Sequence, residues 1–446
     1  MKKLFYLCAA AAVLVFSCGK DETSSKGGDG QRPAPPDTTA VTPPDTTGRP
    51  DPEPLPDPDT FPEKLPSPGR IPIVAWHGVR ASQVSVARFR EAAELGITVN
   101  YTRFSDTETA CKALEYAGQA GVKLIVECDA LYSDTRREAA VKKLMRYPAL
   151  EAYFCKDEPL CSEFPTIARM MNAIQAVDPD HYCYANLFPA GPAEHLQALG
   201  VATYREYVQR YLNEVPAAFL SFDEYPLVTN PGSSVRLIKD TWYEDLEIVA
   251  DEARKANKKF WAFALTCPHV VYPVPTLSDL RLQLYSDLAY GAQVLQYFTY
   301  WTPTVSGDWN YRMAPIAEDG NRTATYDLVK TVTSEIQRLS GVFLGARVVS
   351  VRHTGTSVPK GTVRLTDLPE PVRRLETEGS GAVVSQLENQ GYTFLVIVNR
   401  DPNTAMGLRF EAESRVRQVL KNGSIVPADD ITEMTVDPGD AVIYMW

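Results

Sequence analysis

The chain has 446 residues, of which 44% are hydrophobic and 23% charged, a composition typical of a globular protein with about two domains. Its formal net charge is −11, because 56 acidic residues outnumber 45 basic ones. A chain this acidic, without a local basic patch, repels phosphate backbones. The composition therefore argues against nucleic acid as a partner and favours a neutral or weakly charged ligand.

Residues 1–18 predict a lipoprotein signal peptide. Two lysines precede an apolar run, residues 4–16, that is too short to span a bilayer comfortably. Residues 15–19, Val-Phe-Ser-Cys-Gly, resemble a bacterial lipobox, in which the cysteine becomes the lipid-modified N-terminus. The acidic stretch at 20–22 resembles the surface-export signal of Bacteroidetes lipoproteins. The resemblance implies lipidation at Cys18 and a surface-exposed outer-membrane protein; the alternative is an ordinary secretory signal that a cysteine happens to follow.

Residues 19–69 predict a tether. They are dense in Pro, Asp, Thr, Ser and Gly, and the run Pro-Pro-Asp-Thr-Thr at 35–39 is repeated at 43–47. Such a segment lacks the apolar content that folding requires, so we expect an extended, disordered spacer between the membrane and the folded body.

Residues 70–345 alternate between strand-like and helix-like stretches. The predicted strands are 71–77, 98–104, 123–127, 150–156, 181–187, 217–222, 259–265 and 293–300. The predicted helices are 85–95, 107–120, 135–146, 164–177, 203–213, 241–256, 277–290 and 325–339. Eight such units predict a (β/α)8 TIM barrel. The rival fold, a doubly wound open sheet, is disfavoured because no glycine-rich phosphate loop follows any strand.

After residue 345 the pattern changes to short apolar or alternating runs separated by Pro, Asn and Gly. We expect residues 346–446 to form a small all-β sandwich. Its predicted strands are 347–352, 392–399, 416–420, 434–436 and 441–446.

Six cysteines remain beyond the signal and the anchor, and none has the spacing of metal ligands. Several lie inside apolar, strand-like runs, which favours buried free thiols, although a Cys155–Cys161 bridge is an alternative. The sequence predicts neither a metal nor a cofactor.

Two predicted strands end in an acidic pair that a proline closes. The fourth ends in Asp157-Glu158-Pro, and the sixth in Asp223-Glu224-Tyr-Pro. In a barrel of this kind the working residues lie at the carboxyl ends of the strands. Glycosidic cleavage needs one carboxylic acid that protonates the leaving oxygen and one carboxylate that attacks or activates water. We therefore predict Glu158 and Glu224 as the catalytic pair.

Asp157 and Asp223 should face the other side of their strands if the alternation continues, and they are candidates for substrate binding. Bulges at strand ends can override this alternation. The alternative for each pair is structural, as a helix cap or a salt bridge, but its repetition on two strands of one barrel favours function. Glu127 and Asp129, at the third strand, are weaker candidates for which the structural interpretation is favoured. Arg103 and Lys156 could supply the positive charge that lowers the pKa of one carboxyl.

Aromatic and polar side chains are concentrated at the same strand ends. Sugar rings stack their C–H faces on aromatic side chains, and their hydroxyls bind polar groups. The predicted substrate-binding residues, besides the two aspartates, are Trp76, His77, Arg103, Asn186, Tyr225, Tyr300, Trp301 and Trp309. For His77 and His269 a structural role is an equal alternative, and Trp261 and Tyr297 are expected in the barrel core.

The ending Tyr-Phe-Cys-Lys-Asp157-Glu158-Pro resembles the fourth-strand signature of clan A glycoside hydrolases, in which an Asn-Glu-Pro ending carries the general acid/base. The resemblance implies that role for Glu158. The barrel followed by a small β-domain resembles family 42 β-galactosidases. Two features depart from the clan: Asp157 stands where the clan has Asn, and the seventh strand ends in Thr-Cys-Pro-His269 without the nucleophilic Glu.

These observations favour a surface glycoside hydrolase acting on plant or host glycans. Either Glu224 replaces the missing nucleophile, as in barrel clans for α-glycosides that pair the fourth and sixth strands, or the mechanism is another clan's, or activity is lost. A catalytically degenerate, glycan-binding lipoprotein is therefore the second hypothesis. A purely structural surface protein is the third, and it leaves the aromatic residues unexplained.

Overall fold

The computed structural model describes residues 61–305, 307, 309–429 and 431–446. The predicted signal peptide, Cys18 and most of the predicted tether lie outside the described residues. At the start of the described part, Leu65 is buried and its amide donates to the carbonyl of Gly423 at 2.8 Å. None of the helices in the described part is both long and apolar enough to cross a bilayer.

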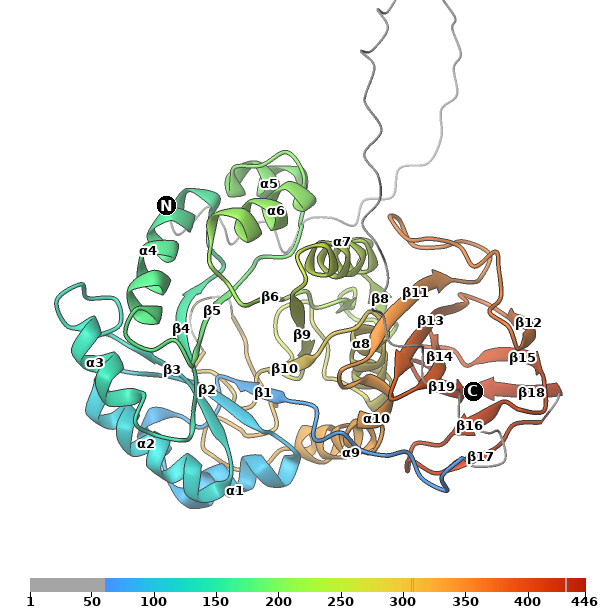
Figure 1. The fold of residues 1–446 in the computed structure, drawn as a ribbon, viewed down its shortest axis with the longest axis horizontal. Helices are drawn as coiled ribbons and strands as arrows, with labels where there is room; N and C mark the ends of the chain where they lie inside the picture. The colour runs from blue at the N-terminus through green and yellow to red at the C-terminus, as the bar shows by residue number, and fades with distance from the viewer. Residues whose placement is uncertain (1–60, 306, 308, 430) are drawn as a thin grey trace, which may run out of the picture. The chain divides into compact units, whose positions relative to one another are not determined.

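Eight parallel strands form a nearly closed barrel (Figure 1). The strands are β1 (Ile73–Trp76), β2 (Val99–Phe104), β3 (Lys123–Cys128), β4 (Leu150–Asp157), β5 (Tyr182–Asn186), β6 (Phe219–Phe222), β9 (Lys259–Leu265) and β10 (Val294–Phe298). Their order is β5-β4-β3-β2-β1-β10-β9-β6. A single bridge between Leu187 and Phe222 joins β5 to β6 at their carboxyl ends. The predicted TIM barrel is confirmed.

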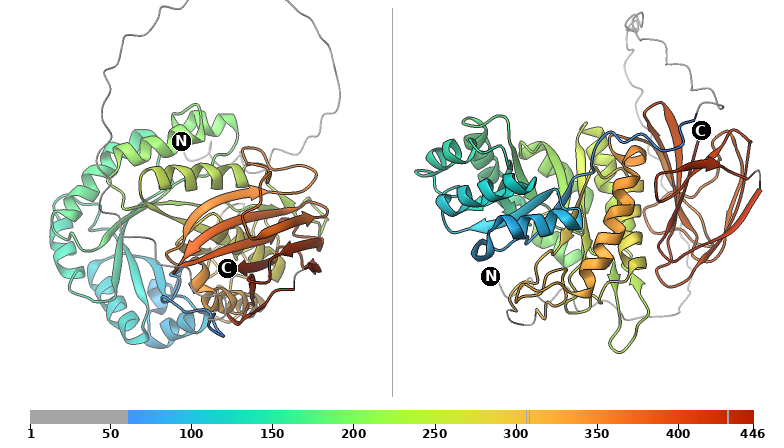
Figure 2. Two further views of the ribbon diagram at one scale, coloured as in Figure 1. Left: turned by 45° about the vertical axis from the view of Figure 1, so that its right-hand side comes forward. Right: turned by 90° about the horizontal axis from the view of Figure 1, so that it is seen from below.

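Helices surround the strands (Figure 2). They are α1 (Val86–Leu95), α2 (Thr107–Ala120), α3 (Arg137–Leu144), α4 (Phe164–Gln175), α6 (Tyr204–Glu214), α7 (Trp242–Lys255), α8 (Leu277–Ala289) and α9 (Ala324–Arg338), with the shorter α5 (Ala193–Leu199) and α10 (Ser340–Phe343). Local sequence sets their ends. The Ser85 side chain accepts a hydrogen bond from the amide of Arg88 to start α1, and Gly96, at φ 101°, ends it.

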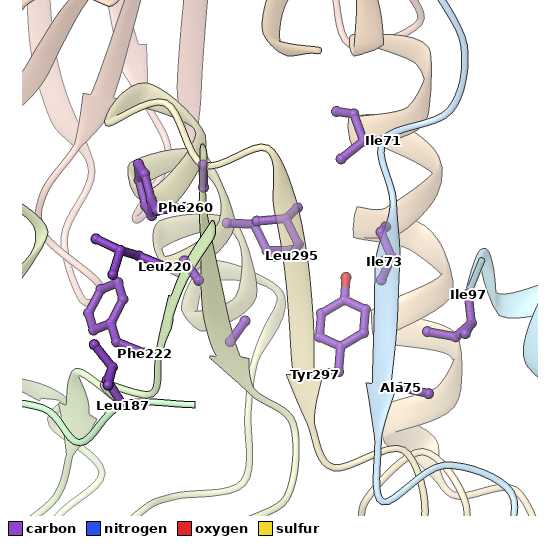
Figure 3. Packing of buried hydrophobic residues seen from close by; sticks show 14 of the residues in the cluster. Ile71, Ile73, Ala75, Ile97, Leu187, Leu220, Phe222, Phe260, Leu295 and Tyr297 are labelled. Carbon is purple, nitrogen blue, oxygen red and sulfur yellow. The ribbon is translucent and has the colours of Figure 1, made fainter. Parts of the chain in front are cut away.

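Each barrel strand sends alternate side chains to two different cores. Those facing outward pack beneath the helices, as Figure 3 shows for Leu220 and Phe222 of β6 and for Ile73 of β1. Those facing inward form a separate interior cluster to which every strand contributes; its members include Trp76, Tyr101, Phe154, Tyr184, Phe219 and Trp261. Because both faces of each strand are buried, the strand sequences are nearly continuous runs of apolar residues.

A two-sheet β-domain follows the barrel, as predicted. One sheet contains β11 (Arg347–His353), β13 (Ala382–Asn389), β14 (Tyr392–Asn399), β19 (Ala441–Met445), β16 (Arg417–Val419) and β17 (Ile425–Pro427). The other contains β12 (Val372–Thr377), β15 (Met406–Ala412) and β18 (Ile431–Val436). The larger sheet shares a buried cluster with the barrel helices, and the Ser385 hydroxyl donates to the carbonyl of Ala289 in α8 at 2.6 Å. The β-domain therefore packs directly on the outer layer of the barrel.

Candidate active site

Regular alternation at the end of β6 sends Asp223 and Glu224 to opposite sides of the strand. Phe219 belongs to the interior cluster, whereas Leu220 and Phe222 belong to the outer core. Continuing this period of two residues directs Asp223 to the inside of the barrel and Glu224 to the outside.

A bulge at the end of β4 changes the alternation there. Phe154 pairs with Tyr184, but the next pair is Lys156 with Ala185, so two residues of β4 stand opposite one of β5. Asp157 is then opposite the inward-facing Asn186. The extra residue therefore turns Asp157 into the barrel, contrary to the expectation from simple alternation.

Glu158 leaves the strand in a left-handed conformation. Its φ is 45°, which is uncommon for a residue with a Cβ, and its amide donates to the carbonyl of Asn186 at 2.8 Å. Burial and the neighbouring Asp157 carboxylate raise the pKa of Glu158 to about 8, although Lys156 opposes the shift. This carboxyl can therefore hold a proton at neutral pH.

The carboxyls of Asp157, Glu158 and Asp223 form one interacting group, hereafter the carboxyl cluster. Burial raises the pKa of Asp157 to about 6, although its side chain still reaches solvent. Burial, and then the charges of Glu158 and Asp157, raise the pKa of Asp223 well above its usual value. One oxygen of Asp223, Oδ1, is buried and has no hydrogen-bond partner among the described residues. Such a cluster retains protons at neutral pH because it cannot ionise completely.

Glu224 lies behind β6, apart from the inward-facing carboxyls, although its charge also raises the pKa of Asp223; the structure therefore brings Asp223, and not the predicted Glu224, together with Glu158. Glu224 is 3% exposed. Its Oε1 forms an ion pair with Lys239 Nζ at 3.0 Å and accepts a hydrogen bond from the Thr241 hydroxyl at 3.1 Å. The reason is the undisturbed alternation of β6, which gives the inward position to Asp223 instead.

Asn186 was predicted to contact substrate, but it is fully buried. Its Oδ1 accepts a hydrogen bond from Ser221 at 2.8 Å, and its Nδ2 is 3.4 Å from Asp157 Oδ1. It therefore lies beneath the carboxyl cluster, where only protein groups reach it.

Two aromatic candidates lie at the end of β1. Trp76 is 3% exposed and packs among Tyr101, Phe154 and Phe263, so it forms part of the interior beneath the strand ends. His77 is exposed at its outer edge, at φ 42°, but the protein atoms around its ring partly desolvate the imidazole, and this desolvation, followed by the charge of Arg80, lowers its pKa to about 4. His77 is therefore a neutral imidazole at the mouth of the barrel.

The aromatic residues after β6, β9 and β10 contact one another in sequence. Tyr225 is partly exposed, and its ring centroid lies 5.3 Å from that of Phe298. Trp309 stacks on Tyr311 with 6° between the ring planes, and its centroid is 5.5 Å from that of His269. These contacts place the predicted Tyr225 and Trp309 in one aromatic group, to which the sequence analysis did not assign Phe298 or Tyr311.

Tyr300 and Trp301 differ from the prediction, because both are buried behind the strand ends. They are 1% and 2% exposed. Arg88 of α1 lies over the Trp301 ring, 5.1 Å from its centroid, and the Trp301 indole donates to the carbonyl of Glu318. Their burial leaves no ring face for a sugar.

Arg103 lies at the rim and is already paired. It is 3.0 Å from Asp129 and 3.6 Å from Glu127. Glu127, 7% exposed, also accepts hydrogen bonds from Tyr101 at 2.5 Å and from Tyr132 at 3.1 Å. Glu127 therefore has the structural environment that the sequence favoured, although it faces inward beside Asp157 and raises its pKa.

The remaining polar candidates do not form another site. Lys156 turns outward and pairs with Glu163 at 2.8 Å. The described part of the chain contains no group of His, Cys, Asp and Glu side chains arranged to hold a metal ion, and its six cysteines are buried free thiols.

Comparisons with known proteins find this architecture in two solved β-galactosidases of very low sequence identity. No protein-family model matches the sequence, and no curated protein matches it. The GH42 β-galactosidase from G. stearothermophilus, solved as a catalytic mutant, superposes with a TM-score of 0.53 at 8% identity, over 86% of this chain and 100% of that one. The β-galactosidase from Bacillus circulans sp. alkalophilus gives a TM-score of 0.52 at 9% identity, over 84% and 99%. The chain spans only 59% of the β-galactosidase from Marinomonas ef1, with a TM-score of 0.43 at 12% identity, and 58% of the one from Halorubrum lacusprofundi.

At these identities the similarity establishes the fold. The predicted resemblance to a family 42-type barrel with a following β-domain is confirmed at that level.

Proposed function

We propose that this protein is a glycoside hydrolase that uses Glu158 as its general acid and Asp223 as the opposing carboxylate. The observation that carries the proposal is that the ends of β4 and β6 meet at the end of β5: the amide of Glu158 donates to the carbonyl of Asn186 at 2.8 Å, and that of Asp223 to the next carbonyl, Leu187, at 3.3 Å. The charge of Glu158 accordingly helps to raise the pKa of Asp223. In TIM barrels the carboxyl ends of the strands form the face at which catalysis occurs.

The cluster provides both protonation states that the reaction needs. Two interacting carboxyls that share one proton are at once an acid and a base. Glu158 would donate its proton to the glycosidic oxygen as the bond to the anomeric carbon breaks. Asp223, whose raised pKa makes it a stronger base once its own proton has left, would attack that carbon in its ionised form or take a proton from the attacking water. Asp157 is a neighbour of Glu158 on the same strand and cannot flank a sugar from the other side.

Backbone strain supports the same location. Four of the six non-glycine residues with positive φ in the described part lie in loops after barrel strands; they are His77, Glu158, Val270 and Met313. Such conformations cost about 1–3 kcal/mol each and persist mainly at functional sites. At Glu158 the strained backbone adds to the cost of a desolvated carboxyl. A residue with a purely structural role would need neither the strain nor the carboxyl.

The N-terminal segment is the basis for a proposed cellular location. The lipobox-like residues around Cys18 and the Pro-rich stretch support a lipid-anchored enzyme at the outer surface of the outer membrane, acting on oligosaccharides or polysaccharides. Radiolabelled palmitate should label the protein but not a Cys18→Ala variant, and added protease should cleave it on intact cells. Absence of either result would contradict the location alone.

The decisive experiment measures hydrolysis of α- and β-linked aryl glycosides and oligosaccharides. We expect cleavage by the purified protein and a loss of about 10²–10⁴-fold in kcat for Glu158→Gln and for Asp223→Asn. Glu138→Gln, which removes only an exposed partner of Lys142 on α3, serves as the control and should be fully active.

A second function, glycan binding without cleavage, is favoured by one feature. The seventh barrel strand ends in Thr266-Cys-Pro-His269 and has no carboxylate at the position where the clan A resemblance implies a nucleophile. If the protein binds oligosaccharides in calorimetry but hydrolyses none of them, this second function replaces the first.

A further inference from the structure

A chain of fully buried hydrogen bonds runs beneath the carboxyl cluster. Tyr184 Oη donates to Gln296 Oε1 at 2.7 Å, and Gln296 Nε2 donates to Ser221 Oγ at 2.9 Å. Ser221 Oγ donates to Asn186 Oδ1 at 2.8 Å. All four residues are 0% exposed, and they connect β10, β6 and β5 inside the barrel.

When the carboxyl cluster carries negative charge, the hydrogen bonds of this chain run in one direction, from Tyr184 as the first donor to Asn186. Tyr184 has a single proton and gives it to the carbonyl of Gln296, so the amide nitrogen of Gln296 faces Ser221. Ser221 accepts that hydrogen bond and gives its own proton to the carbonyl of Asn186. The amide nitrogen of Asn186 is therefore the end of the chain, and it faces the carboxyl cluster.

Asn186 Nδ2 donates to one carboxyl of the cluster and affects the pKa of a second. It is 3.4 Å from Asp157 Oδ1 of β4, and its hydrogen bonding also lowers the pKa of Asp223 beyond β6. In contrast, the Glu158 carboxyl accepts no hydrogen bond from any described residue. The amide thus reaches the two aspartates but not the proposed general acid.

Resting on the proposed function, we propose that Asn186 is a positioning residue: the Tyr184–Gln296–Ser221 chain fixes its amide so that it stabilises the ionised form of Asp157 while Glu158 keeps the proton. An inverted amide would set its oxygen against a carboxylate oxygen, and the Ser221 hydroxyl would lose Asn186 Oδ1 as its acceptor and keep only the longer contact with Tyr184 Oη, at 3.1 Å.

The other groups around Asp157 show why the amide of Asn186 determines whether Asp157 is ionised. The charged and titratable groups that face it are Tyr101 of β2, Glu127 of β3, Lys156 and Glu158 at the end of β4, Tyr184 of β5, and Asp223 and Tyr225 after β6. The carboxylates among them disfavour the charged form of Asp157. Lys156 favours it but is held by Glu163, so Asn186 is the only hydrogen-bond donor to Asp157 among the described residues.

The test is a titration that does not depend on activity. The full chain is labelled with [4-¹³C]aspartate, and the carboxyl signal of Asp157, assigned with Asp157→Asn, is followed against pH. At pH 6 about half of Asp157 should be ionised in the unmodified protein, since burial raises its pKa to about 6. Asn186→Leu removes the donor and should shift the titration to higher pH.

Two further variants keep the test falsifiable. Ser221→Ala breaks the chain one step away from Asp157 and should shift its titration in the same direction, by less, even if Asn186→Leu fails to fold. Asn399→Leu is the matched control: this fully buried asparagine of the β-domain donates to three backbone carbonyls, and its loss should destabilise the fold without moving the Asp157 signal.

An Asp157 titration that is unchanged in Asn186→Leu and Ser221→Ala, or that shifts equally in Asn399→Leu, would overturn the inference. The outcome is separable from that of the proposed function. If the titration shifts but no glycoside is cleaved, the role of Asn186 stands and the hydrolase proposal fails. If hydrolysis is observed, the acidic limb of its pH profile should also move to higher pH in Asn186→Leu.

Discussion

At the end of β4, Asp157 and Glu158 both belong to the carboxyl cluster, whereas at the end of β6 only Asp223 does and Glu224 pairs with Lys239 behind the strand. The two endings have the same order of residue types, Asp-Glu and then a proline. What separates them is the backbone: β4 has a bulge and a left-handed residue, and β6 has neither. A carboxylate at a strand end is thus assigned to a site by register, not by its position in a motif.

The largest expected effect is on activity, and it comes from comparing substitutions at the neighbouring residues Asp223 and Glu224. Asp223→Asn should lower kcat by about 10²–10⁴-fold, because it removes a carboxyl from the proposed reaction. Glu224→Gln should leave the activity of the folded protein nearly unchanged. Steady-state kinetics on aryl glycosides, corrected for the folded fraction by circular dichroism, measures both. The reverse ranking would return the catalytic role to Glu224.

The next effect is a loss of stability in Glu224→Gln, the variant whose activity should be nearly unchanged. The side chain of Glu224 is 2% exposed and that of Lys239 31%, so Glu224→Gln leaves a partly buried ammonium without its partner. We expect the free energy of unfolding to fall by about 2–3 kcal/mol, somewhat less than for a fully buried pair. Denaturant unfolding measures this loss. The double variant Glu224→Leu with Lys239→Met should recover most of it, and a double variant as unstable as the single one would show that the ion pair is not the cause.

Much of this fold could be predicted from the sequence, because it depends on periodicity. All eight barrel strands and their helices lie where apolar runs and helix-ending residues such as Gly96 place them. In the β-domain the prediction does not include β12, β13, β15 and β17. β15 carried a local signal, because its buried Met406, Leu408 and Phe410 alternate with Gly and charged residues, the pattern of a half-buried strand.

The site could be predicted only in part, since its details depend on tertiary contacts. The strand-end rule located the mouth and Glu158. No local signal distinguishes a bulge at Cys155, so the inward turn of Asp157 was not foreseen. Trp301 resembled a sugar-stacking residue, but the arginines of neighbouring elements that cover it are remote in sequence. The Tyr184–Gln296–Ser221–Asn186 chain links three strands and becomes visible only in the closed barrel.

The third expected effect is a pH dependence of stability that Glu158 introduces. Its pKa is about 8 in the folded protein and 4.5 when unperturbed, so the unfolded chain releases this proton first. Below pH 4.5 the residue is protonated in both states and costs nothing. As pH rises towards 8, the folded state should lose stability relative to Glu158→Gln, by at most about 1.4 kcal/mol per pH unit. Thermal unfolding of both proteins between pH 5 and 8 measures the difference; parallel curves would contradict the raised pKa.

The smallest effect compares glycine and alanine at the two glutamates. At position 158 the backbone has φ 45°, where alanine is strained by about 1–3 kcal/mol and glycine is not. Glycine also lowers stability by about 0.5–1 kcal/mol through the entropy of the unfolded chain. Glu158→Gly should therefore be about 1 kcal/mol more stable than Glu158→Ala.

At position 224, which is not among the residues with positive φ, the order should reverse, and Glu224→Ala should be the more stable of that pair. Because both variants of each pair lack the carboxyl, the lost charge cancels and the difference in unfolding free energy reports the backbone alone. Equal differences at the two positions would mean that the left-handed turn at Glu158 is not what distinguishes the end of β4 from the end of β6.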